Sequence, residues 1–235
     1  MKNLVVAEAG LIAHGRGECF DYIIGEKTTS MARNAIKAAV ATLIIAEKPV
    51  ISVNGNIAAL VPEELAELSK LLDIPLEINL FYQQKGRIDA IKKVLESAGA
   101  RDIRGINEKK QIVLDYLESN RRKVEYIAEA DVVLVPLEDG DRTEALKRNN
   151  KKVIAIDLNP LSRTALWADI TIVDNVVRVL PIMVEIAKEF KNLSEIELKN
   201  ILSKFDNKTN IQNTLDLIVN YIKKQKEVAF RILEQ

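Results

Sequence analysis

Cysteine and histidine are nearly absent from this chain of 235 residues, which carries one of each, Cys19 and His14. A disulfide within the chain is therefore excluded, and so is a zinc site built from several Cys and His side chains. Scarce cysteine suits a reducing compartment, and we expect a cytoplasmic protein.

An excess of charge of either sign is also absent, since Lys and Arg number 34 and Asp and Glu number 34. A net charge of zero gives no general attraction to nucleic acid or to an anionic membrane, and we expect neither as a partner. The N-terminal apolar stretch from Leu4 to Ala13 is interrupted by Glu8 and is too short to span a membrane. A local basic site for a small molecule that carries phosphate is compatible with this balance.

The standard nucleotide-binding and hydrolase signatures are missing. The sequence contains no G-x-x-x-x-G-K-[ST] loop, no G-x-G-x-x-G turn after a strand candidate and no G-x-S-x-G turn. A nucleotide would therefore bind in a non-standard way.

Short apolar runs alternate along the chain with longer runs of helical periodicity. Most of the apolar runs are continuous, which is typical of strands covered on both faces in a parallel sheet. The alternation predicts an α/β fold with a doubly wound, mostly parallel sheet. The expected strands are residues 50–53, 76–81, 131–136, 153–156 and 170–173, with a weaker one at 100–104, and the expected helices are 30–47, 62–72, 87–98, 109–128, 142–148 and 175–190.

Residues 191–235 differ in character, because they contain no strand pattern and favour two amphipathic helices, at 194–205 and 211–233. We expect residues 1–190 to form the sheet domain and residues 191–235 to form a helical C-terminal extension that packs on this domain or on a second subunit. A regulatory or partner-binding role for the extension is the alternative.

Polar residues cluster directly after each of the five stronger strand candidates. Because ligands of open α/β sheets bind beyond the carboxyl ends of the strands, this density predicts a polar ligand site at that edge. A sheet without a ligand needs a capping Asp or Ser at such ends, and not this many polar groups. The clusters are residues 54–56, 82–87, 137–143, 157–164 and 174–175.

The cluster at 137–143 illustrates the two interpretations that each segment allows. In a ligand site, Asp139 and Asp141 would hold Mg²⁺ and Arg142 would hold phosphate. In a purely structural loop, Asp141 would cap the helix that follows. The other clusters carry the same alternative of capping or burial, with Asn56 expected as the cap of its helix; the residues concerned are Asn54, Asn56, Asp157, Asn159, Arg163, Thr164, Asp174 and Asn175.

Arg16 lies between Gly15 and Gly17 near the start of the chain. Glycine permits close approach of the backbone, and the guanidinium offers a planar fork for phosphate or carboxylate. We expect a turn here, and the alternative to a ligand-binding turn is a tight turn with an exposed Arg.

Four strings resemble, in this order, the archaeal phosphopantothenate synthetases, which are 4-phosphopantoate–β-alanine ligases. The resemblance extends from about residue 5 to about residue 190. The strings are long and unusual: Gly10-Leu11-Ile12-Ala13-His14-Gly15-Arg16-Gly17-Glu18, Pro49-Val50-Ile51-Ser52-Val53-Asn54-Gly55-Asn56, Val135-Pro136-Leu137-Glu138-Asp139-Gly140-Asp141-Arg142-Thr143 and Ile156-Asp157-Leu158-Asn159-Pro160-Leu161-Ser162-Arg163-Thr164.

The resemblance implies a Rossmann-like homodimer that joins 4-phosphopantoate to β-alanine with ATP and Mg²⁺, through an acyl-adenylate, giving 4′-phosphopantothenate, AMP and pyrophosphate for coenzyme A synthesis. Arg16 and Arg163 are expected to stabilise the reacting phosphates. Lys85 or Arg87 is a candidate for the substrate's own phosphate, beside Asn54, Asn56 and Arg142. The ATP contacts implied by the resemblance are Arg16, Asp157, Leu158, Asn159, Arg163, Thr164, Asp174 and Asn175.

Two rival functions stay open on the sequence. One is a non-catalytic nucleotide-binding protein of the same fold, which the long helical tail favours, as does a further ATP-contacting Arg of the family that has no counterpart here. The other is a Rossmann-like transferase acting on a nucleotide-linked substrate.

Overall fold

The computed structural model describes residues 3–80, 86–117 and 123–234. Its centre is a six-stranded sheet in the order β3-β2-β1-β6-β7-β8, in which every pairing is parallel. The expected α/β fold is thereby confirmed. The strands are β1 (Pro49–Val53), β2 (Leu76–Ile78), β3 (Ile103–Arg104), β6 (Val132–Pro136), β7 (Lys152–Ile156) and β8 (Ile170–Ile172).

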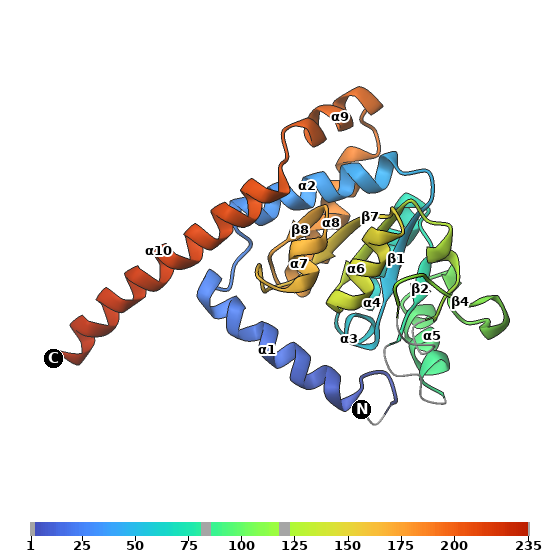
Figure 1. Ribbon diagram of the computed structural model, residues 1–235, viewed down its shortest axis with the longest axis horizontal. Coiled ribbons are helices and arrows are strands. Elements are labelled where there is room, and N and C mark those ends of the chain that lie inside the picture. The colour runs from blue at the N-terminus through green and yellow to red at the C-terminus, as the bar shows by residue number, and fades with distance from the viewer. Residues whose placement is uncertain (1–2, 81–85, 118–122, 235) are drawn as a thin grey trace.

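Helices cover both faces of the sheet, as Figure 1 shows. One face is covered by α2 (Ser30–Ile45), α3 (Gly55–Leu60), α4 (Pro62–Leu72), α5 (Arg87–Ser97) and α8 (Val176–Phe190). The other face is covered by α6 (Gly140–Arg148) and α7 (Arg163–Trp167), together with the segment that follows β3. The expected helices at 30–47, 62–72, 87–98, 142–148 and 175–190 are confirmed to within two residues at each end.

The sheet separates two apolar clusters, one on each face, because successive side chains of a strand point to opposite sides. Ile51, Leu134 and Ile154 face the larger cluster under α2, α4 and α8. Val50, Val133 and Val153 lie side by side in the strand register and face the smaller cluster. The uninterrupted apolar strands of the sequence are explained by this burial on both sides.

The expected helix at residues 109–128 is wrong. The described part of this stretch holds two short 3₁₀ turns, η1 (Glu108–Lys110) and η2 (Tyr126–Ala128), and an antiparallel pair, β4 (Ile112–Val113) with β5 (Lys123–Val124). The buried carboxylate of Glu77 on β2 accepts the backbone N–H groups of Glu125 and Ile127, each at 2.7 Å. A long-range hydrogen-bonding partner therefore replaces the helical hydrogen bonds that the sequence pattern favours.

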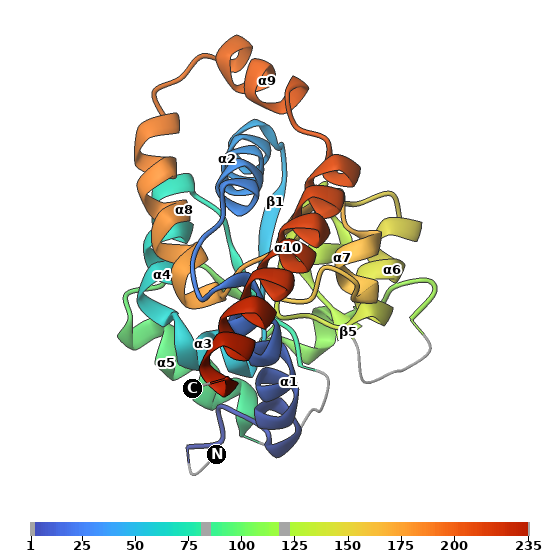
Figure 2. The same cartoon turned by 90° about the vertical axis from the view of Figure 1, so that its left-hand side faces the viewer.

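A long helix, α1 (Glu8–Ile24), was not among the expected elements. It crosses the carboxyl edge of the sheet and reaches α10 (Asn207–Leu233), which also contacts α2 and β8. Figure 2 shows α1 and α10 on the same side of the molecule.

The C-terminal extension consists of α9 (Glu195–Ser203) and α10, close to the two expected helices. Ser194 and Glu197 form a reciprocal capping box at the start of α9. Asn207 and Asn210 of α10 hydrogen-bond the backbone of Thr171 on edge strand β8, each at 2.8 Å. Every residue from 222 to 234 is exposed, and the C-terminal end of α10 projects away from the body (Figure 1). Within the described residues, no helix is both long enough and apolar enough to cross a membrane.

Candidate active site

A cleft of about 480 Å³ opens at the carboxyl ends of β6 and β7, under α1. Small-molecule sites commonly enclose about 300–1,000 Å³. The cleft lies at the edge where the sequence placed the ligand. Of the predicted site residues, it brings together Arg16, Asn56, Asp139, Asp157, Leu158, Asn159, Arg163 and Thr164.

Arg16 reaches the cleft from the middle of α1, so the expected turn at Gly15 and Gly17 is wrong. At Gly17, α1 lies against the β7 loop, and a Cβ there would make ordinary van der Waals contact with Leu158 at 3.7 Å. A Cβ at Gly10 would approach the side-chain amide oxygen of Asn56, Oδ1, to 2.5 Å. Of the glycines in this string, Gly10 is therefore the one that the close approach of α1 to Asn56 requires.

The loop after β7 is held in shape by its own polar side chains. The carboxylate of Asp157 accepts the backbone N–H of Asn159 at 2.9 Å and the hydroxyl of Ser162 at 2.5 Å. Ser162 in turn caps α7 by accepting from the backbone of Ala165. Burial raises the pKa of Asp157 above its usual value, against the effect of these hydrogen bonds. Leu158 anchors the loop in a small apolar cluster with Ile24 of α1 and Ile218 of α10.

Arg163 and Thr164, at the start of α7, join this loop to the β6 loop. The Arg163 guanidinium pairs with the Asp141 carboxylate, and the Thr164 hydroxyl donates to the Glu138 carbonyl at 2.8 Å. A Cβ at Gly140 would lie 2.6 Å from the Arg163 side chain. Glycine at position 140 is thus what allows the arginine to pack against α6.

The β6 loop places a buried acid in the cleft that the sequence did not single out. Glu138 follows Leu137, whose φ of 51° is left-handed and uncommon for leucine. The Glu138 carboxylate, with 9% of the side chain exposed, pairs with the buried Arg142 at 3.2 Å. Burial raises the pKa of Glu138 to about 7, against the attraction of Arg142.

Arg142 is 1% exposed and lies beneath the cleft rather than in its wall. Its guanidinium contacts Glu138 and the side-chain oxygen of Asn79, the latter at 3.4 Å. The predicted phosphate contact of Arg142 stays a prediction, and what the structure adds is its pairing with Glu138.

Asn54, and not Asn56, caps the helix after β1. The Asn54 carbonyl oxygen accepts from Asn56 and Ile57, and its amide donates to the carbonyls of Pro136 and Leu137 at 3.0 and 3.1 Å. The Asn56 amide donates to Gly10 of α1 at 3.0 Å. The pair therefore ties β1 to β6 and to α1, and Asn56 also faces the cleft.

Arg87 and Lys85 were the candidates for the substrate's phosphate. Arg87 is buried and donates to the carbonyl groups of Leu4 and Val5, so it fixes the N-terminal segment. Lys85 lies outside the described residues.

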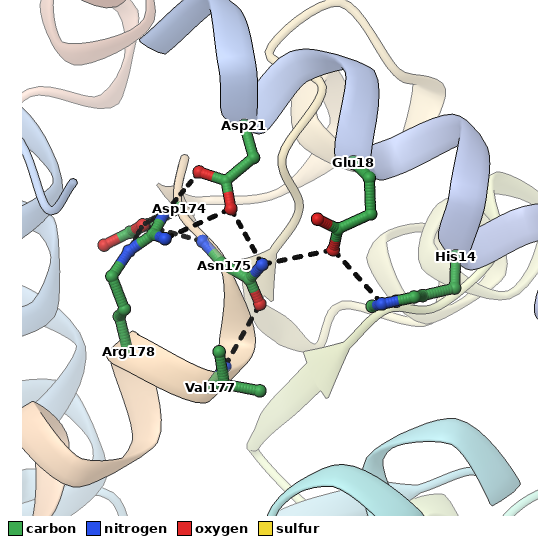
Figure 3. A network of polar contacts seen from close by, with 7 residues as sticks. All are labelled: His14, Glu18, Asp21, Asp174, Asn175, Val177 and Arg178. Carbon is green, nitrogen blue, oxygen red and sulfur yellow. Dashed lines mark hydrogen bonds and ion pairs between the residues drawn. The ribbon is translucent and has the colours of Figure 1, made fainter. Parts of the chain in front are cut away.

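Asp174 and Asn175, at the end of β8, lie in a polar network between α1 and α8 (Figure 3). Arg178 donates to Asp21 and Asp174 at 2.5 and 2.6 Å, and the Asn175 amide donates to Asp21 at 2.8 Å. Burial alone would raise the pKa of Asp21, but the hydrogen bonds from Arg178 and Asn175 bring it below its usual value.

The same network extends along α1 to the cleft. The Asn175 amide also donates to Glu18 at 3.2 Å, and Glu18 pairs with His14, which lines the cleft. The predicted ATP contacts of Asp174 and Asn175 stay predictions, and in this structure both residues hold α1 over the sheet edge. The sequence did not single out Asp21 or Arg178, because their partners are more than 150 residues apart along the chain.

Comparison with known proteins matches the sequence to one family. The family model of phosphopantothenate/pantothenate synthetase covers residues 31–221 of this chain. The chain belongs to this family.

Individual relatives are similar over nearly the whole chain. The chain is 55% identical over 218 residues to a protein of Thermococcus kodakarensis named 4-phosphopantoate–β-alanine ligase, covering 92% of this chain and 83% of that protein. Relatives of the same name in Thermococcus onnurineus and Methanosarcina mazei are 54% identical over 218 residues and 46% identical over 225 residues. The matches cover 92% and 95% of this chain and 83% and 88% of those proteins.

For a phosphopantothenate synthetase, Mg²⁺ is an expected companion of ATP. No group of three or more His, Cys, Asp or Glu residues that could hold a metal occurs in the part of the chain that the structure describes. Asp139 caps α6 by accepting from the Arg142 backbone at 3.0 Å, whereas Asp141 is exposed beside Arg163. Because Mg²⁺ with a nucleotide takes most ligands from phosphates and water, one carboxylate such as Asp141 is a sufficient protein ligand.

Proposed function

We propose that this protein is a 4-phosphopantoate–β-alanine ligase that uses ATP and forms 4′-phosphopantothenate, AMP and pyrophosphate. The observation that carries the proposal is the cleft itself, because α1, β6 and β7 converge on it with the strings that resemble the ligase family. The names of the relatives support the same activity.

ATP is proposed to lie between α1 and the β7 loop. Arg16 from α1 and Arg163 from α7 supply positive charge on two walls of the cleft, and Thr164 lies beside Arg163. Asp157 and Asn159 present a rigid polar loop for the ribose or base, and Leu158 supports it from below. Asp174 and Asn175 are proposed to act on ATP through α1, which they anchor.

The reaction consists of two displacements. The carboxylate of 4-phosphopantoate attacks the α-phosphorus of ATP, and pyrophosphate leaves with the bonding electrons. The amine of β-alanine then attacks the acyl carbon, an amide forms, and AMP leaves. Negative charge grows on the phosphates in the first step, so pre-positioned guanidinium groups stabilise its transition state. When bound at Asp141, Mg²⁺ would neutralise part of the charge on the phosphates.

A homodimer is proposed, with α10 as the contact surface. The part of α10 beyond Ile218 exposes large apolar side chains: Val219, Ile222, Val228, Phe230, Ile232 and Leu233. A helix with such a face gains stability by packing against another surface. Light scattering of the full chain coupled to gel filtration tests this, and a monomer at micromolar concentration would contradict it.

Isotope transfer tests the proposed reaction. The protein is incubated with ATP, Mg²⁺, β-alanine and 4-phosphopantoate labelled with ¹⁸O in its carboxylate, and the products are weighed by mass spectrometry. The proposal predicts one labelled oxygen in AMP for each phosphopantothenate formed. Label in inorganic phosphate with ADP would keep the ligase and reject the adenylate, and absence of product would reject the ligase.

A further inference from the structure

We propose that Glu138 binds the ammonium group of β-alanine, an inference that rests on the proposed ligase function. The argument comes from the place of Glu138 in the sheet, from the carboxylates of the cleft and from the partners that fix the side chain.

Glu138 lies at the point in the sheet where the order of strand connection reverses. The chain proceeds from β1 outward to β2 and β3 on one side, and from β6 outward to β7 and β8 on the other. Adjacent strands that lead away in opposite directions leave a crevice at their carboxyl ends, where ligands of such sheets bind. Asn54 follows β1 and Glu138 follows β6 at this crevice, and the Asn54 amide bonds to the carbonyl of Leu137.

The two sides of the crevice differ in charge. The β7 side carries Arg163 and, from α1, Arg16, which suit the phosphates of ATP. The β1 side carries the neutral amide of Asn56. Because the acyl group must touch the α-phosphate and the amine must reach the acyl carbon, the reacting atoms meet between the two sides, beside Glu138.

Three carboxylates line the cleft in the described part of the chain, and each accepts a backbone N–H of its own loop. Asp139 caps α6, and Asp157 accepts from Asn159 and Ser162. Glu138 accepts from the backbone of the adjacent Asp139 and, in addition, forms an ion pair with the buried Arg142.

The partners of Glu138 fix its carboxylate. Arg142 is almost fully buried and also contacts Asn79, so its side chain is held in one conformation beside Glu138. A carboxylate shielded from water attracts a cation more strongly than an exposed one. The raised pKa of Glu138 agrees with such a role. Burial disfavours the charged carboxylate although Arg142 lies beside it, and a second positive group, the ammonium of β-alanine, would stabilise the charged form.

The test compares a charged with an uncharged nucleophile in the full-length protein. Glu138→Gln keeps the size of the side chain and a side-chain oxygen but removes the charge that pairs with Arg142. The matched control is Glu129→Gln, because Glu129 is 68% exposed and pairs with Lys48. Melting temperatures of both variants establish that they are folded.

A charge-assisted hydrogen bond of this kind corresponds to roughly a ten- to hundredfold change in affinity. We expect KM for β-alanine to rise by that factor in Glu138→Gln, while trapping of the activated acyl group by hydroxylamine, which is uncharged at neutral pH, proceeds as in the wild type. An unchanged KM for β-alanine, or an equal loss with both nucleophiles, would overturn the inference.

A measurement on the wild type keeps the inference testable if Glu138→Gln fails to fold. Propylamine, a cation without the carboxylate of β-alanine, should compete with β-alanine, and propionate at the same concentration should compete less. Propylamine without effect would overturn the role of Glu138. Ligation by the wild-type protein tests the proposed function on its own. The role of Glu138 is tested by comparing nucleophiles or competitors in a protein that already shows this activity, so the two proposals fail separately.

Discussion

The ends of β7 and β8 look alike in sequence but differ in the structure. Both strands are followed by Asp and Asn, at Asp157 and Asn159 and at Asp174 and Asn175. The first pair lines the cleft, whereas the second pair is buried beneath α1 with Arg178 and Asp21. Polar residues at a sheet edge therefore either line the cleft or hold the helix that covers it, and the contacts separate the two arrangements.

The largest effect is expected at the β7 end. Arg163→Ala should lower kcat by about 10²–10³, the usual cost of removing one group that stabilises developing charge. Steady-state ligation with the exposed Arg101→Ala as control checks this. Unchanged turnover would remove Arg163 from the phosphate site.

At the β8 end the expected loss is of stability. Arg178→Met leaves the fully buried Asp174 without its cation, and breaking such a pair costs about 3 kcal/mol of unfolding free energy. Urea denaturation measures this. Intact stability with lost ATP affinity would mean that this network contacts the ligand after all.

The pH dependence of stability sharpens the contrast further. The pKa of Asp21 is lower in the fold than its usual value near 3.8, so its contribution is fully present above that value and is lost as the pH falls through the folded pKa. The difference in unfolding free energy between the wild type and Asp21→Asn should be constant from about pH 7 to about pH 5 and shrink below about pH 4. A difference that does not change with pH would contradict the ion pair.

The smallest effect concerns α1 itself. Gly15 has open space around its Cβ position, so Gly15→Ala should stabilise the helix by about 0.5–1 kcal/mol. Gly10→Ala is the matched comparison and should destabilise, because its Cβ would meet Asn56 at 2.5 Å. Equal melting temperatures for the two variants would show that α1 does not pack on the sheet edge as described.

The sequence predicted the sheet, because continuous apolar strands and helical periodicity are local signals. The polar residues after each strand also predicted a ligand site at the edge where the cleft lies, and that ligand site stays a prediction. It missed α1, since the glycines at positions 15 and 17 disfavour a helix locally, and the contacts that hold α1 come from residues far along the chain. It did not single out Glu138, because the burial of this acid and of Arg142, four residues further along, depends on how the chain packs around the cleft. The false helix at residues 109–128 has the same origin, since Glu77 is remote in sequence.

Hydrogen exchange of the full chain, with and without ATP, Mg²⁺ and 4-phosphopantoate, tests the central claim most directly, namely that the nucleotide lies between α1 and the β7 loop. The account predicts that the ligands slow exchange in residues 8–24 and 157–164. Exchange in residues 213–224, which contribute to a separate cleft between the end of α1 and α10, should slow much less. Protection at 213–224 with none at 157–164 would contradict it.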